Sequence, residues 1–247
     1  MLFKEFGNKS LKTIVLVHGG GLSWWAYKSV VDLLERDYHV VTPIIDGHGE
    51  DGDNPFLSIE DSAKKLIEYI DLEHGGKVFA LTGLSIGAQI VTEVISLRND
   101  ITEFAIIESA LLIPIKGAAT MAKINNLIFR LIKRRWFSKV QAKSMSIPKE
   151  MFDIYYNDSI RMTKQSLINI TLSNGNYKVK PTLSETKAKA MIIVGEKEIG
   201  IMRLSASKLT AAIPRCKLYV AQDMRHGELS LVHPKKYIEL LRTFFED

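Results

Sequence analysis

The chain has 247 residues, a formal net charge of +5, 46% hydrophobic residues and 25% charged residues. This composition excludes a largely disordered chain, and the length allows one large α/β domain with an insertion. A single cysteine excludes an intrachain disulfide and a cysteine-rich metal cluster. We find neither a signal peptide nor an apolar run of the roughly 18 residues that span a membrane, so we expect a cytoplasmic protein.

The first half of the sequence alternates buried strands with amphipathic helices. We expect strands at residues 11–17, 38–43, 77–84 and 104–107, and helices at residues 26–36, 58–74 and 86–98. This alternation predicts an α/β fold, with a mostly parallel sheet that is flanked by helices and joined by right-handed crossovers. Reactive groups should then gather at the carboxyl ends of the strands.

Two loops in this half carry candidate functional groups. His18-Gly19-Gly20-Gly21 follows the first strand, and its unshielded backbone N–H groups suit an oxyanion site, with Gly20 the expected donor. The loop at 44–53 carries three aspartates and a histidine, but they do not recur at a recognised metal-ligand spacing. We interpret that loop as a polar turn and expect no metal site.

A serine between two glycines, Gly83-Leu84-Ser85-Ile86-Gly87, lies where a strand ends and a helix begins. This spacing is typical of a strained turn that exposes the hydroxyl above the sheet. The following helix points its N-terminus at the reacting group, so the backbone N–H of Ile86 becomes the second oxyanion donor. We therefore expect Ser85 to be a nucleophile.

The alternation stops between residues 112 and 180, which we interpret as a helical cap inserted into a core formed by residues 1–111 and 181–247. Residues 112–149 carry nine basic side chains and no acid, so the rest of the chain has a net charge of +5 − 9 = −4. Apolar residues recur at helical spacing from Ile124 to Ile132, beside basic ones. Three interpretations of this basic helix stay open: contact with substrate, with an anionic lipid surface, or only with solvent.

Strands return at residues 190–194 and 217–220, with helices at 202–212 and from about 234 to the end. A serine nucleophile needs a histidine base, and the histidine needs a carboxylate that fixes its tautomer. His226 lies in the loop after the last strand, where it can reach the serine. Glu198 is our preferred acid because it follows the preceding strand by a short loop; Glu196, Glu108 and Asp223 are its competitors.

Together these motifs resemble the α/β-hydrolase family, in the chain order of serine, acid and histidine. His18-Gly19-Gly20-Gly21 is similar to its oxyanion loop, the Ser85 motif to its nucleophile elbow, and His226-Gly227-Glu228 to its histidine loop. The resemblance covers essentially the whole chain, with residues 112–180 in the position of the family's cap. Two features depart from the family pattern: the acid is a glutamate where aspartate is commoner, and the short amino terminus suggests that one early strand is missing.

The resemblance implies a serine hydrolase, most simply a carboxylesterase, that cleaves a small-molecule ester or thioester without a cofactor. The expected catalytic residues are Ser85, His226 and Glu198, with Gly20 and Ile86 forming the oxyanion hole. Two alternatives stay open: a C–C bond hydrolase or lyase acting on an acidic substrate, and a non-catalytic ligand-binding protein. We expect no nucleic-acid partner, and the sequence does not indicate the oligomeric state or the acyl-chain preference.

Overall fold

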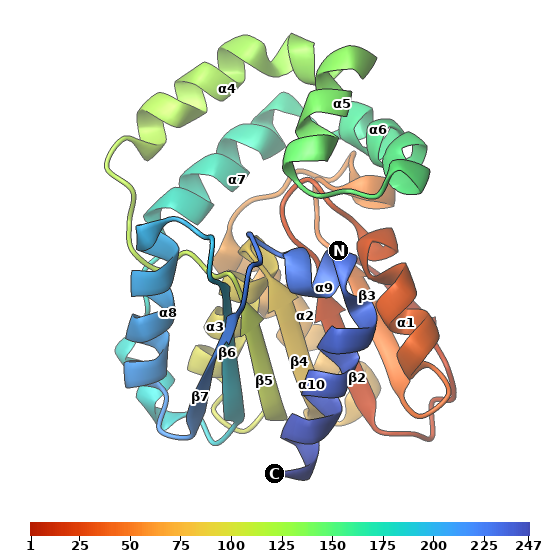
Figure 1. The fold of residues 1–247 in the computed structure, drawn as a ribbon, viewed down its shortest axis with the longest axis vertical. Helices are drawn as coiled ribbons and strands as arrows, with labels where there is room; N and C mark the ends of the chain where they lie inside the picture. Colours follow the sequence, from red (N-terminus) through yellow and green to blue (C-terminus); the bar gives the residue numbers. More distant parts are fainter.

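The computed structural model describes residues 1–247 and contains one sheet of seven strands, in the order β1-β3-β2-β4-β5-β6-β7 (Figure 1). The strands are β1 (Leu2–Phe6), β2 (Thr13–Val17), β3 (His39–Ile44), β4 (Val78–Leu84), β5 (Thr102–Glu108), β6 (Lys189–Gly195) and β7 (Cys216–Ala221). All neighbouring strands run parallel except β1, which pairs antiparallel with β3 at one edge. The predicted α/β fold with a mostly parallel sheet is therefore confirmed.

Ten α-helices accompany the sheet. They are α1 (Lys28–Leu34), α2 (Ile59–His74), α3 (Ile86–Leu97), α4 (Ala118–Ile132), α5 (Arg135–Ser144), α6 (Phe152–Arg161), α7 (Lys164–Asn176), α8 (Gly200–Ala212), α9 (Glu228–Val232) and α10 (Pro234–Glu246). Short 3-10 turns occupy residues 24–27, 49–51, 149–151 and 181–185. No helix in the structure combines the length and the apolarity that crossing a membrane requires.

The side chains of each strand alternate between two hydrophobic cores, one on each face of the sheet. On β2, Val15 and Val17 belong to the core that α2, α3 and α8 cover. Ile14 and Leu16 belong to the other core, beneath α1 and α10. Because the central strands are buried on both faces, they read in the sequence as continuous apolar runs.

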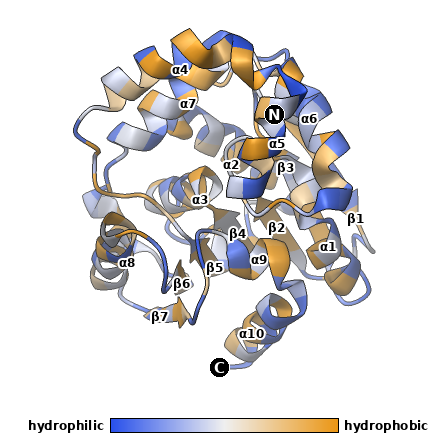
Figure 2. Ribbon diagram, turned by 45° about the horizontal axis from the view of Figure 1, so that its top comes forward, coloured by the Kyte–Doolittle hydropathy of each residue, from blue (hydrophilic) through white to orange (hydrophobic).

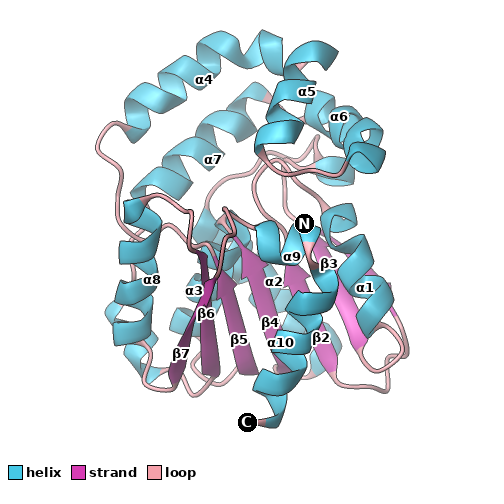
Figure 3. Cartoon of the chain, in the orientation of Figure 1, coloured by secondary structure: helices cyan, strands magenta, loops and turns pink.

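Helices α4–α7 form a separate group between β5 and β6 in the chain (Figure 1). The arrowheads of the strands point toward this group, so its helices lie above the carboxyl ends of the parallel strands (Figure 3). The loops after β2, β4, β5, β6 and β7 all open at the same edge. Any site that forms there is bounded by the sheet below and by α4–α7 above.

The structure differs from the predictions in the details of some elements. Residues 2–6 form an edge strand that the sequence did not suggest, because its pairing with β3 is a long-range contact. The helix expected at 26–36 is a 3-10 turn followed by the shorter α1. The cationic helix of the insertion begins at Ala118, whereas the apolar periodicity in the sequence begins six residues later, at Ile124.

Candidate active site

Ser85 lies at the junction of β4 and α3 with a positive φ of 56° and a ψ of −115°, a strained conformation for a residue other than glycine. The flanking glycines allow this turn because other backbone crowds them. A Cβ added to Gly83 would lie 2.4 Å from the carbonyl oxygen of Gly87, and a Cβ on Gly87 would lie 2.3 Å from that of Val17. Both positions therefore require glycine, for steric reasons.

The register of the sheet fixes where Ser85 lies. Leu84 is paired with Glu108 of β5, and the backbone N–H of Ser85 donates to the carbonyl oxygen of Glu108 at 2.9 Å. Ile86 is the first residue of α3, so its N–H has no acceptor within the helix. Ser85 thus stands at the carboxyl edge of the sheet, next to a free N–H at a helix N-terminus.

The glycine loop after β2 brings a second N–H group to Ser85. Gly20 faces the side chain of Ile86, since a Cβ added to Gly20 would lie 3.7 Å from Ile86 Cγ2. No hydrogen bond uses the N–H of Gly20. Gly20 and Ile86, the residues predicted from the sequence as oxyanion donors, border the same hollow as Ser85.

The side chain of His18 fixes the position of the glycine loop through hydrogen bonds to the backbone. It is fully buried; its Nε2 accepts from the backbone N–H of Ile45 at 3.1 Å, and its Nδ1 lies 2.9 Å from the carbonyl oxygen of Gly19. These partners put the proton on Nδ1, which donates to Gly19, so the ring is neutral. Burial, together with a smaller contribution from the neighbouring His48, lowers the pKa of His18 to about 3. His18 therefore shapes the loop at any ordinary pH.

His226 and Glu198 form a hydrogen-bonded pair on the loops after β7 and β6. His226 Nδ1 lies 2.8 Å from Glu198 Oε2. The carboxylate is almost fully buried, while 48% of the imidazole surface is exposed. An imidazole that donates from Nδ1 keeps Nε2 unprotonated and able to take a proton.

Two further donors hold the Glu198 carboxylate. Its Oε1 accepts from the Ser109 hydroxyl at 2.7 Å and from the Gly195 N–H at 2.8 Å. Burial by itself raises the pKa of Glu198, but the bonds from His226, Ser109 and Gly195 outweigh it and hold the pKa below its ordinary value. The carboxylate is thus kept ionised beside the imidazole.

The three competing acids lie elsewhere. Glu108 is buried and its Oε1 accepts only a long 3.4 Å bond from the Ser230 N–H, while its Oε2 has no partner. Burial raises the pKa of Glu108 to about 7. Glu196 accepts from the backbone N–H of Asp223, and the Asp223 carboxylate pairs with Lys197. Among the candidates, only Glu198 is hydrogen-bonded to His226.

Two hollows meet at Ser85. The larger, of about 270 Å³, lies between the glycine loop and the insertion; the smaller, of about 110 Å³, contains His226. Ser85, Gly20, Leu22 and Met145 border both. Ser85 and His226 face the smaller hollow without a direct hydrogen bond between them. Such a bond is often long in an unliganded active site and shortens when substrate binds.

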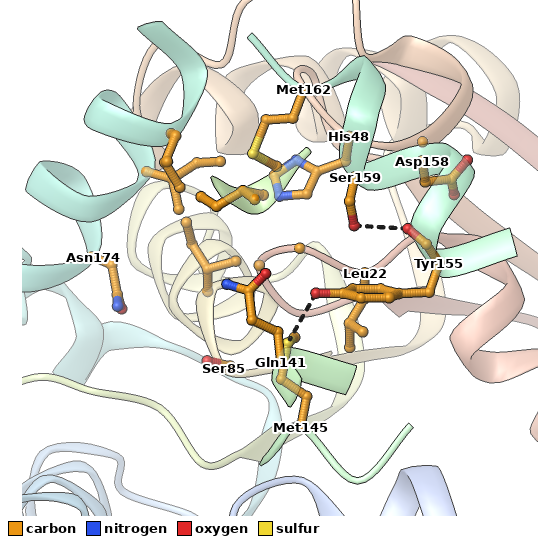
Figure 4. Close-up of a pocket in the computed structure, with 17 residues that line it drawn as sticks. Leu22, His48, Ser85, Gln141, Met145, Tyr155, Asp158, Ser159, Met162 and Asn174 are labelled. Atoms are coloured by element: carbon orange, nitrogen blue, oxygen red, sulfur yellow. Dashed lines mark hydrogen bonds between the residues drawn. The ribbon is translucent and has the colours of Figure 1, made fainter. Parts of the chain in front are cut away.

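The larger hollow is mostly apolar, and side chains of the insertion border it (Figure 4). Its apolar lining consists of Leu22, Ile86, Ile132, Met145, Tyr155, Met162, Leu167 and Ile170. Six polar side chains also border it: His48, Ser85, Gln141, Asp158, Ser159 and Asn174. His48 Nδ1 bonds to the carbonyl oxygen of Asp46, which leaves the buried Nε2 without a partner. Burial raises the pKa of Asp158, whose Oδ2 accepts from Trp25 Nε1 at 2.6 Å.

The acidic loop at 44–53 uses its carboxylates in ion pairs. Asp46 accepts from Lys65 Nζ at 3.1 Å, and Asp53 lies 3.5 Å from a guanidinium nitrogen of Arg161. No group of three or more His, Cys, Asp or Glu side chains in the structure has the arrangement of a metal site.

The structure brings together the residues that the sequence singled out, and adds others that it missed. Ser109 follows β5 directly, and that position after a strand was the only available signal for it. The contribution of Asp158 gave no signal, because a long insertion can fold over the sheet in many ways. His48 was noted only as part of a polar turn, yet its ring faces the larger hollow.

Comparisons with known proteins agree with this geometry. Residues 14–240 match the family model described as the alpha/beta hydrolase family. A curated protein of Gibberella zeae, described as an AB hydrolase superfamily protein, is 30% identical over 96 residues, which make up 38% of this chain. That alignment spans 34% of the relative, so this chain matches only about a third of the relative's length.

Solved structures resemble nearly the whole chain. The enol-lactonase from Burkholderia xenovorans LB400 has a TM-score of 0.82 at 14% identity, covering 100% of this chain and 96% of that one. A thermophilic esterase from Thermogutta terrifontis has a TM-score of 0.76 at 18% identity, covering 99% and 93%. At these identities the likeness concerns the fold.

Proposed function

This chain belongs to the alpha/beta hydrolase family, and from that premise we propose that it is a serine hydrolase that cleaves a carboxylic ester or thioester. Ser85 is the nucleophile, His226 the general base and Glu198 the acid that orients it. The observation that carries this proposal is the buried Glu198, bound to Nδ1 of a half-exposed imidazole that borders the same hollow as Ser85.

The proposed reaction has two steps. Ser85 Oγ attacks the carbonyl carbon as its proton passes to His226 Nε2, and Glu198 stabilises the imidazolium that results. The N–H groups of Gly20 and Ile86 bind the oxyanion, which is worth about 3 to 4 kcal/mol of barrier for a well-placed donor. The intermediate then expels the alcohol or thiol, which takes the proton from His226, and a water molecule releases the acid by the same route.

The lining of the larger hollow favours a neutral, mostly apolar substrate. None of its 17 residues is a lysine or an arginine, and Asp158 is its only carboxylate. At about 270 Å³, the hollow lies at the small end of the range of roughly 300 to 1,000 Å³ that is usual for ligand sites. We therefore propose that the substrate is a small or medium ester. Because no lysine or arginine lines the hollow, the lining gives no support to the alternative of a C–C bond hydrolase that acts on an acidic substrate.

The test combines active-site labelling with turnover. We expect a fluorophosphonate probe to modify Ser85, with p-nitrophenyl esters of short and medium acyl chains as substrates. Ser85→Ala should abolish labelling and lower kcat by at least about a thousandfold. The matched control is Ser207→Ala, which removes an exposed hydroxyl of α8 that bonds only within its helix and should leave both readouts unchanged.

Other outcomes would contradict the proposal in distinct ways. If folded Ser85→Ala keeps its ester turnover, Ser85 is not the nucleophile. Labelling of Ser85 without turnover of any ester would point to C–C bond chemistry. A protein that neither reacts with the probe nor turns over esters would be a non-catalytic binding protein.

A further inference from the structure

The basic residues of the insertion do not face the candidate active site. Residues 112–149 carry +9, yet no lysine or arginine borders either hollow at Ser85. Of these nine side chains, only Arg135 forms an ion pair, with Asp153. The charge therefore lies outside both hollows at Ser85.

Helix α4 presents a row of apolar side chains to solvent. Met121, Ile124 and Leu127 are 49%, 52% and 82% exposed, and Leu131 continues the row. Their spacing of three, three and four residues keeps them on one side of the helix. This is unusual, because an amphipathic helix in a globular protein normally turns such a row toward the core.

The exposure of these apolar side chains does not result from poor packing of α4, because the opposite side of the helix is buried. Ala118 and Ala122 are buried there, and a Cβ added to Gly175 of α7 would lie 2.8 Å from Ala118 Cβ. The two helices thus approach closely through small residues. Helix α4 lies at the outer end of the molecule, and hydrophobic residues recur along its length (Figures 1 and 2).

The next helix also exposes apolar side chains, of which Val140 borders a separate groove with Val232 of α9. Trp136 and Val140, four residues apart on α5, are each 63% exposed. We call the four exposed side chains of α4 the outer apolar row: Met121, Ile124, Leu127 and Leu131.

Unpaired basic side chains border the outer apolar row. Lys123, Arg130 and Arg134 are separated by seven and four residues, so they lie along one edge of α4 and its end. Neither α4 nor α5 contains an acidic residue. Exposed apolar residues with a cationic border are the pattern of a helix that lies in the interface of an anionic bilayer.

We infer that the outer surface of α4 docks onto an anionic phospholipid membrane. A bilayer interface accommodates both features at once, since acyl chains bury the outer apolar row while lipid phosphates meet the basic border. A second copy of the same surface would bring two unpaired basic borders together, and the repulsion between like charges opposes pairing. A nucleic acid would neutralise the charge but leave the apolar row in water.

The test is co-flotation of the full chain with vesicles of equimolar phosphatidylcholine and phosphatidylglycerol, compared with pure phosphatidylcholine. We expect binding to the anionic vesicles only, with an affinity that falls as salt is added. Leu127→Ser should weaken binding by about tenfold, because the variant no longer buries one leucine side chain among the acyl chains. Lys123→Ala and Arg130→Ala should each weaken binding by about fivefold.

Helix α8 offers matched controls on another side of the molecule. Leu204 is 61% exposed and Lys208 lies one turn later, so Leu204→Ser and Lys208→Ala make the same chemical changes outside the proposed surface. We expect both to bind vesicles like the parent protein. All variants alter exposed side chains, and circular dichroism with thermal melting verifies that they fold.

Four results would overturn the inference: no binding to anionic vesicles, equal binding to neutral ones, Leu127→Ser binding like the parent, or the α8 controls losing binding equally. A charge-dependent complex with nucleic acid that Leu127→Ser leaves unchanged, together with no vesicle binding, would assign the surface to that partner instead. A dimer in sedimentation velocity that Leu127→Ser dissociates would assign it to a second copy. Vesicle binding is read without catalysis, so these outcomes are independent of the labelling of Ser85.

Discussion

Replacing Glu198 by glutamine tests the proposed acid with almost no change in shape. Both donors that bind Oε1, the Ser109 hydroxyl and the Gly195 N–H, require an acceptor. The amide oxygen of the new side chain must stay with them, so its NH₂ group faces His226 Nδ1. Nδ1 then has to accept, which moves the imidazole proton to Nε2, the atom that should take the proton of Ser85.

The expected loss follows from these contacts. Flipping the amide would set its NH₂ group against the Gly195 N–H, and a buried donor without an acceptor costs about 1 to 3 kcal/mol. The productive tautomer is therefore populated in at most about a fifth of the molecules. The imidazolium also loses its charged partner, and the same change in other Ser-His-acid triads lowers kcat by about 10⁴. We expect a loss of about 10³ to 10⁴ in kcat, or about 4 to 5.5 kcal/mol.

The assay is the turnover of a p-nitrophenyl ester, with Glu108→Gln as the matched control. That change is also acid to amide in a buried side chain, but Glu108 makes no bond to His226. We expect its kcat to stay within a few-fold of the parent value. The reasoning is refuted if Glu198→Gln keeps a tenth or more of the activity, or if Glu108→Gln loses as much.

Two further predictions concern stability. Because burial raises the pKa of Glu108 from 4.5 to about 7, the folded state holds a proton that the unfolded chain has lost. Stability therefore falls as the pH rises through that window, by up to about 3 kcal/mol. Urea unfolding at about pH 5 and about pH 8 should show this loss in the parent and not in Glu108→Gln; an equal pH dependence in both would contradict it. Gly87→Ala should destabilise the fold by about 3 kcal/mol, since its Cβ would lie 2.3 Å from the Val17 carbonyl oxygen. Gly200→Ala, where a Cβ meets nothing within 4 Å, should change the unfolding free energy by less than about 0.5 kcal/mol.

The sequence predicts the central part of the fold because the information there is local. A strand, a turn and a helix around Ser85 require apolar runs and glycines within 20 residues, and β4 and α3 follow that pattern. The edge strand β1 was missed, because only its pairing with β3 makes residues 2–6 a strand.

The surroundings of the site were harder to foresee. Periodicity places Ile124 and Leu127 on one side of a helix, but it does not say whether that side meets another element or solvent. The structure leaves them exposed. In the same way, chain order suggested several acids for His226, and only the folded loops distinguish Glu198 from Glu108.

The division of the larger hollow between two parts of the chain has a consequence for how this protein can change. Its reactive floor, with Ser85 and the glycine loop, comes from segments that the sheet fixes, whereas Ile132, Met162 and Ile170 come from the insertion. Substitutions in the insertion can thus alter the space above Ser85 while the backbone that supports the serine keeps its geometry. Natural or laboratory selection can thus change the substrate preference through the insertion while the proposed catalytic residues stay the same.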